Sequence, residues 1–411
     1  MRTLSRRTNF WIAGAVAALA LWTSVAPTVS YPLYAAHWGL TPTATTVVFA
    51  VYPVILVGVL VFFGDLSDHI GRRKSILAGL VSMLVGVLFF TFAENVWWLY
   101  IGRAFMGIGV GLSLSPASAA MVEFAPDSLK RRASSLTASV AAVGIVAATL
   151  LGGALVQYAP LPLHLDYAVL DATIAAVAVA AWFLPRHTAA ETSSRWRPHA
   201  ALVVPPGQRR VFATAAVALI SSFAVAAVVV GLGSDISRQL GGSDNAFVTG
   251  ALLSLFGFAS AAAANVFAKA SGRTVVAVGS GFSLVGVGLF VLVGASHSLA
   301  LFLIATIVCG VGFSLNFLGG ITLVTAHAAA HHRAGMLSAA YLCAYLLQGI
   351  IAVALGVIAT NIDLVSAVDY GAIALSAIFV VALVLAWRMD RGGGRPARSA
   401  RPAVAAAAAR R

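Results

Sequence analysis

The chain has 411 residues, of which 60% are hydrophobic and 9% are charged, and its formal net charge is +13. Soluble domains carry about 25% charged residues, so these values exclude a core surrounded by water and require lipid as the main solvent. The positive charges stand in short clusters between apolar runs, which argues against a nucleic-acid-binding surface. Composition therefore predicts an all-α polytopic membrane protein.

Apolar runs of spanning length follow one another along the chain. A transmembrane helix needs about 20 mostly apolar residues. Twelve runs of this kind are present, and the links after the third and the ninth are the shortest. The expected spans are 10–32, 44–63, 75–93, 97–121, 134–156, 166–184, 210–232, 246–268, 274–294, 299–324, 335–358 and 364–387.

The basic residues predict how the chain is oriented. Every Lys and Arg except Arg103 and Arg238 falls in a segment that twelve spans would place on one side of the membrane. Cytoplasmic loops carry such an excess of positive charge. We therefore expect an integral, multi-pass protein of the plasma (inner) membrane with both termini in the cytoplasm.

The two halves of the sequence repeat at a constant offset of 201 residues. Gly71-Arg72 aligns with Gly272-Arg273. The run 109–114 aligns with 310–315 in the same register. Parallel six-span repeats are an architecture of transporters, with the substrate path between the halves. The expected parts are an N-terminal half over 1–184, a cytoplasmic linker over 185–209, a C-terminal half over 210–390, and a basic disordered tail over 391–411 that lies near anionic lipid.

A charged turn lies between the second and third spans, in residues 64–74. Gly71 permits a tight reversal. The acids at 65 and 68 fall near a helix C-terminus, where negative charge is unfavourable unless bases such as Arg72 compensate it. The turn closely resembles the signature loop of the major facilitator superfamily, Gly-x-Leu-x-Asp-x-x-Gly-Arg-Arg/Lys, and the residues that match are Gly64, Leu66, Asp68, Gly71, Arg72 and Arg73.

The resemblance implies a fold of two six-helix halves and a turn that latches the cytoplasmic side in the outward-open state. Glu123 resembles the acidic residue that pairs with this loop in relatives, and Arg72 is its expected partner. A charged turn that only fixes topology is the alternative. In the second half Lys269 stands where Asp68 would be, so a second latch is degenerate.

Two ionisable residues inside spans are candidates for ion coupling. Arg103 lies about 9 Å deep in the fourth span, where an unpartnered charge costs a few kcal/mol. The glycines that follow it resemble the span-four motif of the superfamily, in which the arginine is associated with proton coupling. An arginine that snorkels to a carbonyl or head group is the alternative. Asp171 is the acid placed well inside a span.

The resemblance also implies that the first and fourth helices of each half line a central cavity. Single Ser and Thr residues are more often bonded to their own helix than to a ligand. The polar or aromatic candidates for the cavity are Thr28, Tyr31, Ser113, Ser222, Asn316, Tyr341, Tyr345 and Gln348.

We find no motif for an enzyme, a cofactor or a metal. His327, His331 and His332 have the spacing of metal ligands, but two of them fall on Lys130 and Arg131 at the repeat offset, which favours a basic loop. The sequence therefore predicts a monomeric secondary transporter that exports small organic molecules in exchange for protons or another ion. The fifth span lacks the Gly-Pro pair common in exporters, so uptake by symport, facilitated diffusion, and a non-transporting membrane receptor or assembly partner remain alternatives.

Overall fold

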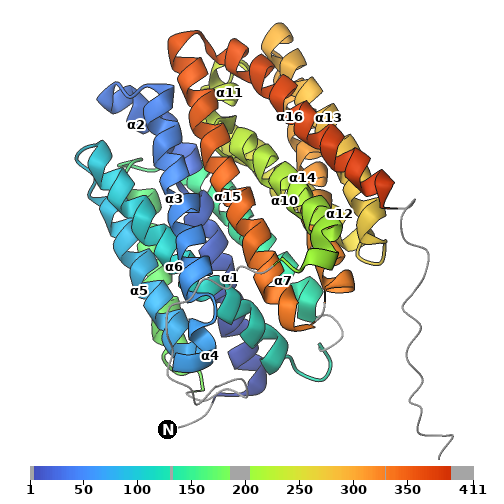
Figure 1. Ribbon diagram of the computed structural model, residues 1–411. Coiled ribbons are helices and arrows are strands. Elements are labelled where there is room, and N and C mark those ends of the chain that lie inside the picture. Colours follow the sequence, from blue (N-terminus) through green and yellow to red (C-terminus); the bar gives the residue numbers. More distant parts are fainter. Residues whose placement is uncertain (1–3, 130–132, 186–203, 329, 390–411) are drawn as a thin grey trace, which may run out of the picture.

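The computed structural model describes residues 4–129, 133–185, 204–328 and 330–389, and the regular structure in these ranges is helical. Most of the expected linker, the expected tail and the basic cluster 130–132 lie outside the described residues. The helices form two groups that lie side by side, coloured blue to green and yellow-green to red in Figure 1. These groups are the two predicted halves.

The N-terminal half follows the predicted spans but contains interruptions. Pro27 begins a second helix directly after the first, because proline lacks the N–H that would continue the helix. A π-helical turn interrupts the fifth span. The elements are α1 (Arg6–Val25), α2 (Pro27–Trp38), α3 (Pro42–Phe63), α4 (Leu66–Ile70), α5 (Arg72–Thr91), α6 (Val96–Phe124), α7 (Ala133–Val146), η2 (Ala147–Leu151), α8 (Gly152–Tyr158) and α9 (Leu165–Ala181).

The C-terminal half repeats this plan. Its first span is also followed by a short separate helix, and α14 has the same 29-residue length as α6. The elements are η3 (Pro206–Gln208), α10 (Arg209–Val229), α11 (Gly233–Gln239), α12 (Ala246–Val266), α13 (Gly272–Ser296), α14 (Leu299–His327), α15 (Ala330–Asn361) and α16 (Leu364–Arg388).

Twelve helical passages are present in the described part of the chain. Within the described residues, eleven segments are long and apolar enough to cross a membrane, and α1 with α2 count as one of them. The twelfth passage is α9, whose 17 residues are extended by a turn that bonds the Trp182 N–H to the Ala178 carbonyl. The predicted all-α, twelve-span architecture is therefore confirmed.

Glycines set the closest helix contacts inside each half. A Cβ on Gly79 of α5 would lie 2.6 Å from the Gly109 carbonyl oxygen of α6. A Cβ on Gly312 of α14 would lie 2.4 Å from the Ser283 hydroxyl of α13. Small residues let membrane helices approach this closely. The repeated runs 109–114 and 310–315 are thus packing surfaces within the halves.

The bundle has two ends, which position the functional groups described below. We call the end that holds the start of α1 and the turn 64–71 the N-terminal face, at the bottom of Figure 1. We call the other end, with the turn between α2 and α3, the opposite face. The long helices α3 and α15 run beside each other along the boundary between the halves.

Candidate functional site

The turn at the N-terminal face forms the predicted ion pair. Gly71 has φ 88°, a conformation that residues with a Cβ rarely adopt. The next residue, Arg72, begins α5, and its guanidinium lies 2.5 Å from the Glu123 carboxylate at the end of α6. Arg6 of α1 donates to the Glu123 backbone carbonyl at 3.1 Å. Three helices of the N-terminal half are therefore joined at this point.

The other residues of the signature turn lie around this pair. Gly64 ends α3, and Asp68 lies in the short helix α4. Arg73 is buried, and its guanidinium lies over the Trp182 ring at 5.0 Å. A cation over an indole face is held electrostatically. This contact joins the start of α5 to the end of α9, so the turn is anchored within its own half.

Arg103 is almost fully buried in α6, with 1% of its surface exposed. Its guanidinium donates to the Ser24 carbonyl at 3.0 Å and lies over the rings of Tyr52 at 4.7 Å and Phe49 at 5.9 Å. The Tyr31 hydroxyl also interacts with this guanidinium. Among the described residues, no carboxylate forms an ion pair with Arg103, and its Nε has no acceptor.

An aromatic cluster from α10, α14 and α15 lies in the C-terminal half. Phe223 is at its centre, 4.3 Å from Tyr345 and 6.5 Å from Tyr341 between ring centroids. Phe313 and Phe317 stack on each other, and each meets the Phe223 ring edge-on. Two of the predicted cavity residues, Tyr341 and Tyr345, therefore belong to one cluster, whose phenylalanines the sequence analysis missed.

Tyr345 connects this cluster to the N-terminal half. It packs against the buried core that includes Tyr52, and the two phenols interact. Arg103 and Tyr52 of one half and Tyr345 and Phe223 of the other thus lie on the two sides of the boundary between the halves.

Three predicted cavity residues instead lie at helix contacts inside a half. Ser113 donates to the Gly109 carbonyl of its own helix, and Ser222 donates to the Phe313 carbonyl. Asn316 bonds the hydroxyls of Ser280 and Ser283 in α13. Their polar atoms are satisfied locally.

The remaining predicted residues have different surroundings. Gln348 is buried, and its Oε1 has no hydrogen-bond partner among the described residues. The carboxylate of Asp171 accepts a hydrogen bond from the Thr91 hydroxyl at 2.8 Å. Thr28 lies at the boundary between the halves, where its carbonyl accepts from the Ser234 hydroxyl at 2.6 Å.

The halves are hydrogen-bonded to each other on the side of the opposite face. Thr43 of α3 and Thr360 of α15 bond through their hydroxyls at 2.8 Å. Gln157 of α8 accepts from the backbone N–H of Ala246 in α12 at 2.8 Å. Together with the bond between Ser234 and Thr28, these contacts hold the opposite face closed. The sequence gives no pattern for them, because they join residues far apart in the chain.

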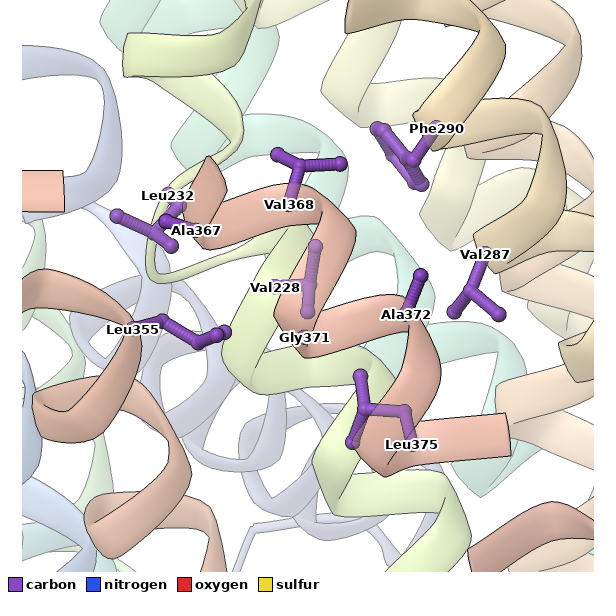
Figure 2. A pocket seen from close by; sticks show the side chains of 10 residues that line it. All are labelled: Val228, Leu232, Val287, Phe290, Leu355, Ala367, Val368, Gly371, Ala372 and Leu375. Atoms are coloured by element: carbon purple, nitrogen blue, oxygen red, sulfur yellow. The ribbon is translucent and has the colours of Figure 1, made fainter. Parts of the chain in front are cut away.

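A small pocket in the C-terminal half has only apolar lining (Figure 2). Phe290 and Val287 of α13 face Val368 and Ala372 of α16 across it. A transported polar molecule needs hydrogen-bonding groups for orientation. This pocket offers none, so the boundary around Arg103 and Tyr345 is the better candidate for a substrate site.

Two six-helix halves that meet at an internal boundary and close at one face are the architecture of a two-domain membrane transporter. Residues 10–352 match the family model described as Major Facilitator Superfamily, and the chain belongs to that superfamily.

Individual relatives resemble only part of this chain. The multidrug efflux pump LfrA of Mycolicibacterium smegmatis is 31% identical over 154 residues, which cover 36% of this chain and 30% of that one. The galactose-proton symporter of Escherichia coli (strain K12) is 32% identical over 87 residues, which cover 21% of this chain and 19% of that one. Each alignment thus spans less than a third of the relative's length.

The fold extends further than these alignments. The crystal structure of a POT family transporter in complex with 5-aminolevulinic acid has a TM-score of 0.75, with 14% sequence identity, and covers 93% of this chain and 96% of that one. At this identity the likeness concerns the fold alone.

Proposed function

We propose that this transporter exports small organic molecules in exchange for protons, and that the N-terminal face is cytoplasmic. The observation that carries the proposal is the boundary where the core that contains Arg103 and Tyr52 packs against Tyr345 and its neighbour Phe223. It lies between two halves that are closed at one face, which is where alternating access requires a substrate site. The clustering of bases on one side of the twelve spans supports the orientation.

The chemistry at this boundary favours amphipathic molecules. Phe223, Tyr341 and Tyr345 offer ring faces for a planar apolar body. Arg103 offers a positive charge without a carboxylate partner among the described residues, which disfavours strongly cationic substrates. The similarity to the efflux pump LfrA covers a longer segment than that to the galactose-proton symporter, which supports export.

Transport by inverted membrane vesicles tests this proposal. In such vesicles an exporter moves compounds into the lumen, and proton exchange requires an acidic lumen. We expect a fluorescent amphipathic compound to accumulate when the lumen is acidified, and to leave when nigericin collapses the pH gradient. Accumulation that needs an alkaline lumen would identify uptake by symport instead.

The receptor alternative makes a different prediction in the same vesicles. A protein that only senses its ligand would bind the compound without moving it across the bilayer. Binding that saturates at one molecule per protein, with no accumulation in the lumen under either gradient, would contradict transport. Vesicles without the protein provide the background.

A further inference from the structure

Asp166, in the first turn of α9, is the most isolated carboxylate in the described part of the chain. It is 1% exposed, and neither of its carboxylate oxygens has a hydrogen-bond partner among the described residues. No described Lys or Arg forms an ion pair with it. The position near a helix N-terminus favours the charge only slightly, compared with the large loss of hydration. Burial without a partner therefore disfavours the charged form of Asp166.

The described groups around Asp166 offer no compensating charge. Tyr34 of α2 and Tyr167 of α9 interact with it, but the Tyr34 hydroxyl donates to the Phe90 carbonyl, and the Tyr167 hydroxyl bonds Ser30. His164 bonds the Thr91 carbonyl. The charged residues of α1 and α5 lie at the N-terminal face, and α8 has none.

Asp166 lies directly behind the contact that closes the opposite face. A Cβ on Gly152, at the start of α8, would lie 3.3 Å from the Asp166 carboxylate. The adjacent Gly153 faces the other half, where a Cβ would lie 2.7 Å from the Ala246 carbonyl oxygen of α12. Two consecutive glycines thus separate the buried carboxyl from the second half. The π-helical turn η2 immediately precedes them, and such turns are frequent at functional sites.

We propose that Asp166 binds the coupling proton, and that its neutral form is required for α8 and α12 to close the opposite face. This inference rests on the proton exchange proposed above. When the face is open, water reaches the carboxylate, and a hydronium ion in that water transfers a proton that forms an O–H bond at one carboxylate oxygen. A water molecule is left, and the negative charge of the side chain is cancelled. The neutral side chain can then be buried against Gly152.

The proton leaves when water reaches the group again from the other side. The O–H bond breaks, water takes the proton, and the carboxylate regains its charge. A charged Asp166 disfavours closure, so the deprotonated protein turns its substrate towards the opposite face. One proton moves inward for each outward transition, as exchange requires.

Asp171 on the same helix is the rival coupling candidate that the sequence analysis named, and replacing it in parallel decides between the two acids. It lies five residues further along α9, and its carboxylate keeps the Thr91 hydroxyl as a donor. A carboxylate with a hydrogen-bond donor tolerates its charge better than one without. Replacing Asp171 therefore tests whether the pH response of opening requires Asp166 itself or is shared by both acids of α9.

The experiment measures opening of the opposite face as a function of pH, without any substrate. Spin labels are placed at Glu94 and Ile362, which are exposed in turns of the two halves, in full-length protein with Cys309 and Cys343 replaced by Ala. Between about pH 5 and pH 8 we expect the open population to rise at least about tenfold in the wild type. Asp166→Asn should stay closed and change less than about twofold, whereas Asp171→Asn should respond like the wild type.

An Asp166→Asn protein that opens with pH as the wild type does would overturn the proposal, and so would loss of the response in Asp171→Asn alone. If the Asp166→Asn protein does not fold, Asp166→Ser replaces it in the same pH measurement. The vesicle assay separates the two hypotheses. Proton-driven accumulation together with an unaffected Asp166→Asn response refutes only this inference. A lost response without any accumulation refutes the export proposal and the coupling of the proton to it, but retains the need for a neutral Asp166 in closure.

Discussion

The hydroxyl oxygens of Thr43 and Thr360 lie 2.8 Å apart, although 317 residues separate them in the chain. Thr43 also donates through its hydroxyl to the Gly356 carbonyl at 3.1 Å, and its N–H donates to the Thr360 hydroxyl at 2.9 Å. This contact joins α3 to α15 at the opposite face, where any opening of that face must separate the two helices.

A covalent bond at this contact should stop transport. In a background without native cysteines, Thr43→Cys and Thr360→Cys together should form a disulfide on oxidation and hold the opposite face closed. We expect vesicle accumulation to fall by at least about tenfold and to recover on reduction, because the cycle requires both states. Each single variant should be insensitive to oxidation. Unchanged transport by the cross-linked protein would contradict an opening between α3 and α15.

The ion pair between Arg72 and Glu123 predicts a defect that depends on charge. Arg72→Gln leaves the partly buried Glu123 carboxylate without its partner, so we expect turnover to fall by about tenfold and the protein to lose about 1–3 kcal/mol of stability. The reversed pair Arg72→Glu with Glu123→Arg should recover part of both. Exposed Lys74 is the control, and its replacement by Gln should leave turnover unchanged.

The close approach of α12 to η2 at Gly250 predicts that a larger residue there prevents closure of the opposite face. A Cβ there would lie 2.0 Å from the Thr149 carbonyl oxygen, a contact between backbones that no side-chain rotation relieves. Gly250→Ala should therefore reduce the closed population by at least about tenfold in the spin-label measurement. Gly281→Ala is the matched helical control, since a Cβ at Gly281 would meet nothing within 4 Å.

Arg103 predicts opposite effects on stability and function. Arg103→Met removes a buried charge that has no carboxylate partner among the described residues. The free energy of unfolding should therefore be unchanged or higher by about 1–4 kcal/mol. Vesicle accumulation should nevertheless fall by at least about tenfold, because the buried cation beside Tyr52 at the proposed substrate site is lost. Unimpaired transport by Arg103→Met would show that the arginine has only a structural role.

Asp363 predicts a local dependence on pH outside the spans. Hydrogen bonds from the backbone N–H and hydroxyl of Ser366 lower the pKa of this carboxyl, which caps α16. Its stabilising effect is complete above the unfolded-state pKa and is lost as pH falls through the lower folded-state pKa. Asp363→Ala should therefore melt at a lower temperature than the wild type at pH 7, with the difference shrinking towards pH 3.

The elements that composition and periodicity determine could be predicted from the sequence. Helices such as α3 and α13 follow from apolar length alone, and the halves follow from the offset of 201. The ion pair between Arg72 and Glu123 was also predicted, because Arg72 matches the signature turn and Glu123 resembles the acidic residue that pairs with this turn in relatives. The predicted cavity residues Ser113 and Asn316 lie instead at contacts inside their halves, since hydropathy does not define which face of an all-apolar helix meets its neighbour.

Contacts between the halves could not be found in this way. Thr43 and Thr360 are ordinary hydroxyl residues near helix ends, and nothing in their local sequence distinguishes them. The place of Phe223 in the aromatic cluster could not be predicted either, because aromatic residues occur at any position of a span. The sequence shows that Asp166 is an acid, but not that it is buried. Its burial depends on α8, because Gly152 lets the backbone of that helix approach the carboxylate.

The hydrogen bonds that close the opposite face are made by hydroxyl, amide and backbone groups, and the close backbone contacts there are made by glycines. Water can replace each such hydrogen bond at nearly equal enthalpy, so exposing these groups costs little free energy. Salt screens interactions between charges and acts weakly on neutral groups. The hydrogen-bonded contacts of this face should therefore break at a rate nearly independent of ionic strength, so this step should be equally fast in dilute and in saline surroundings.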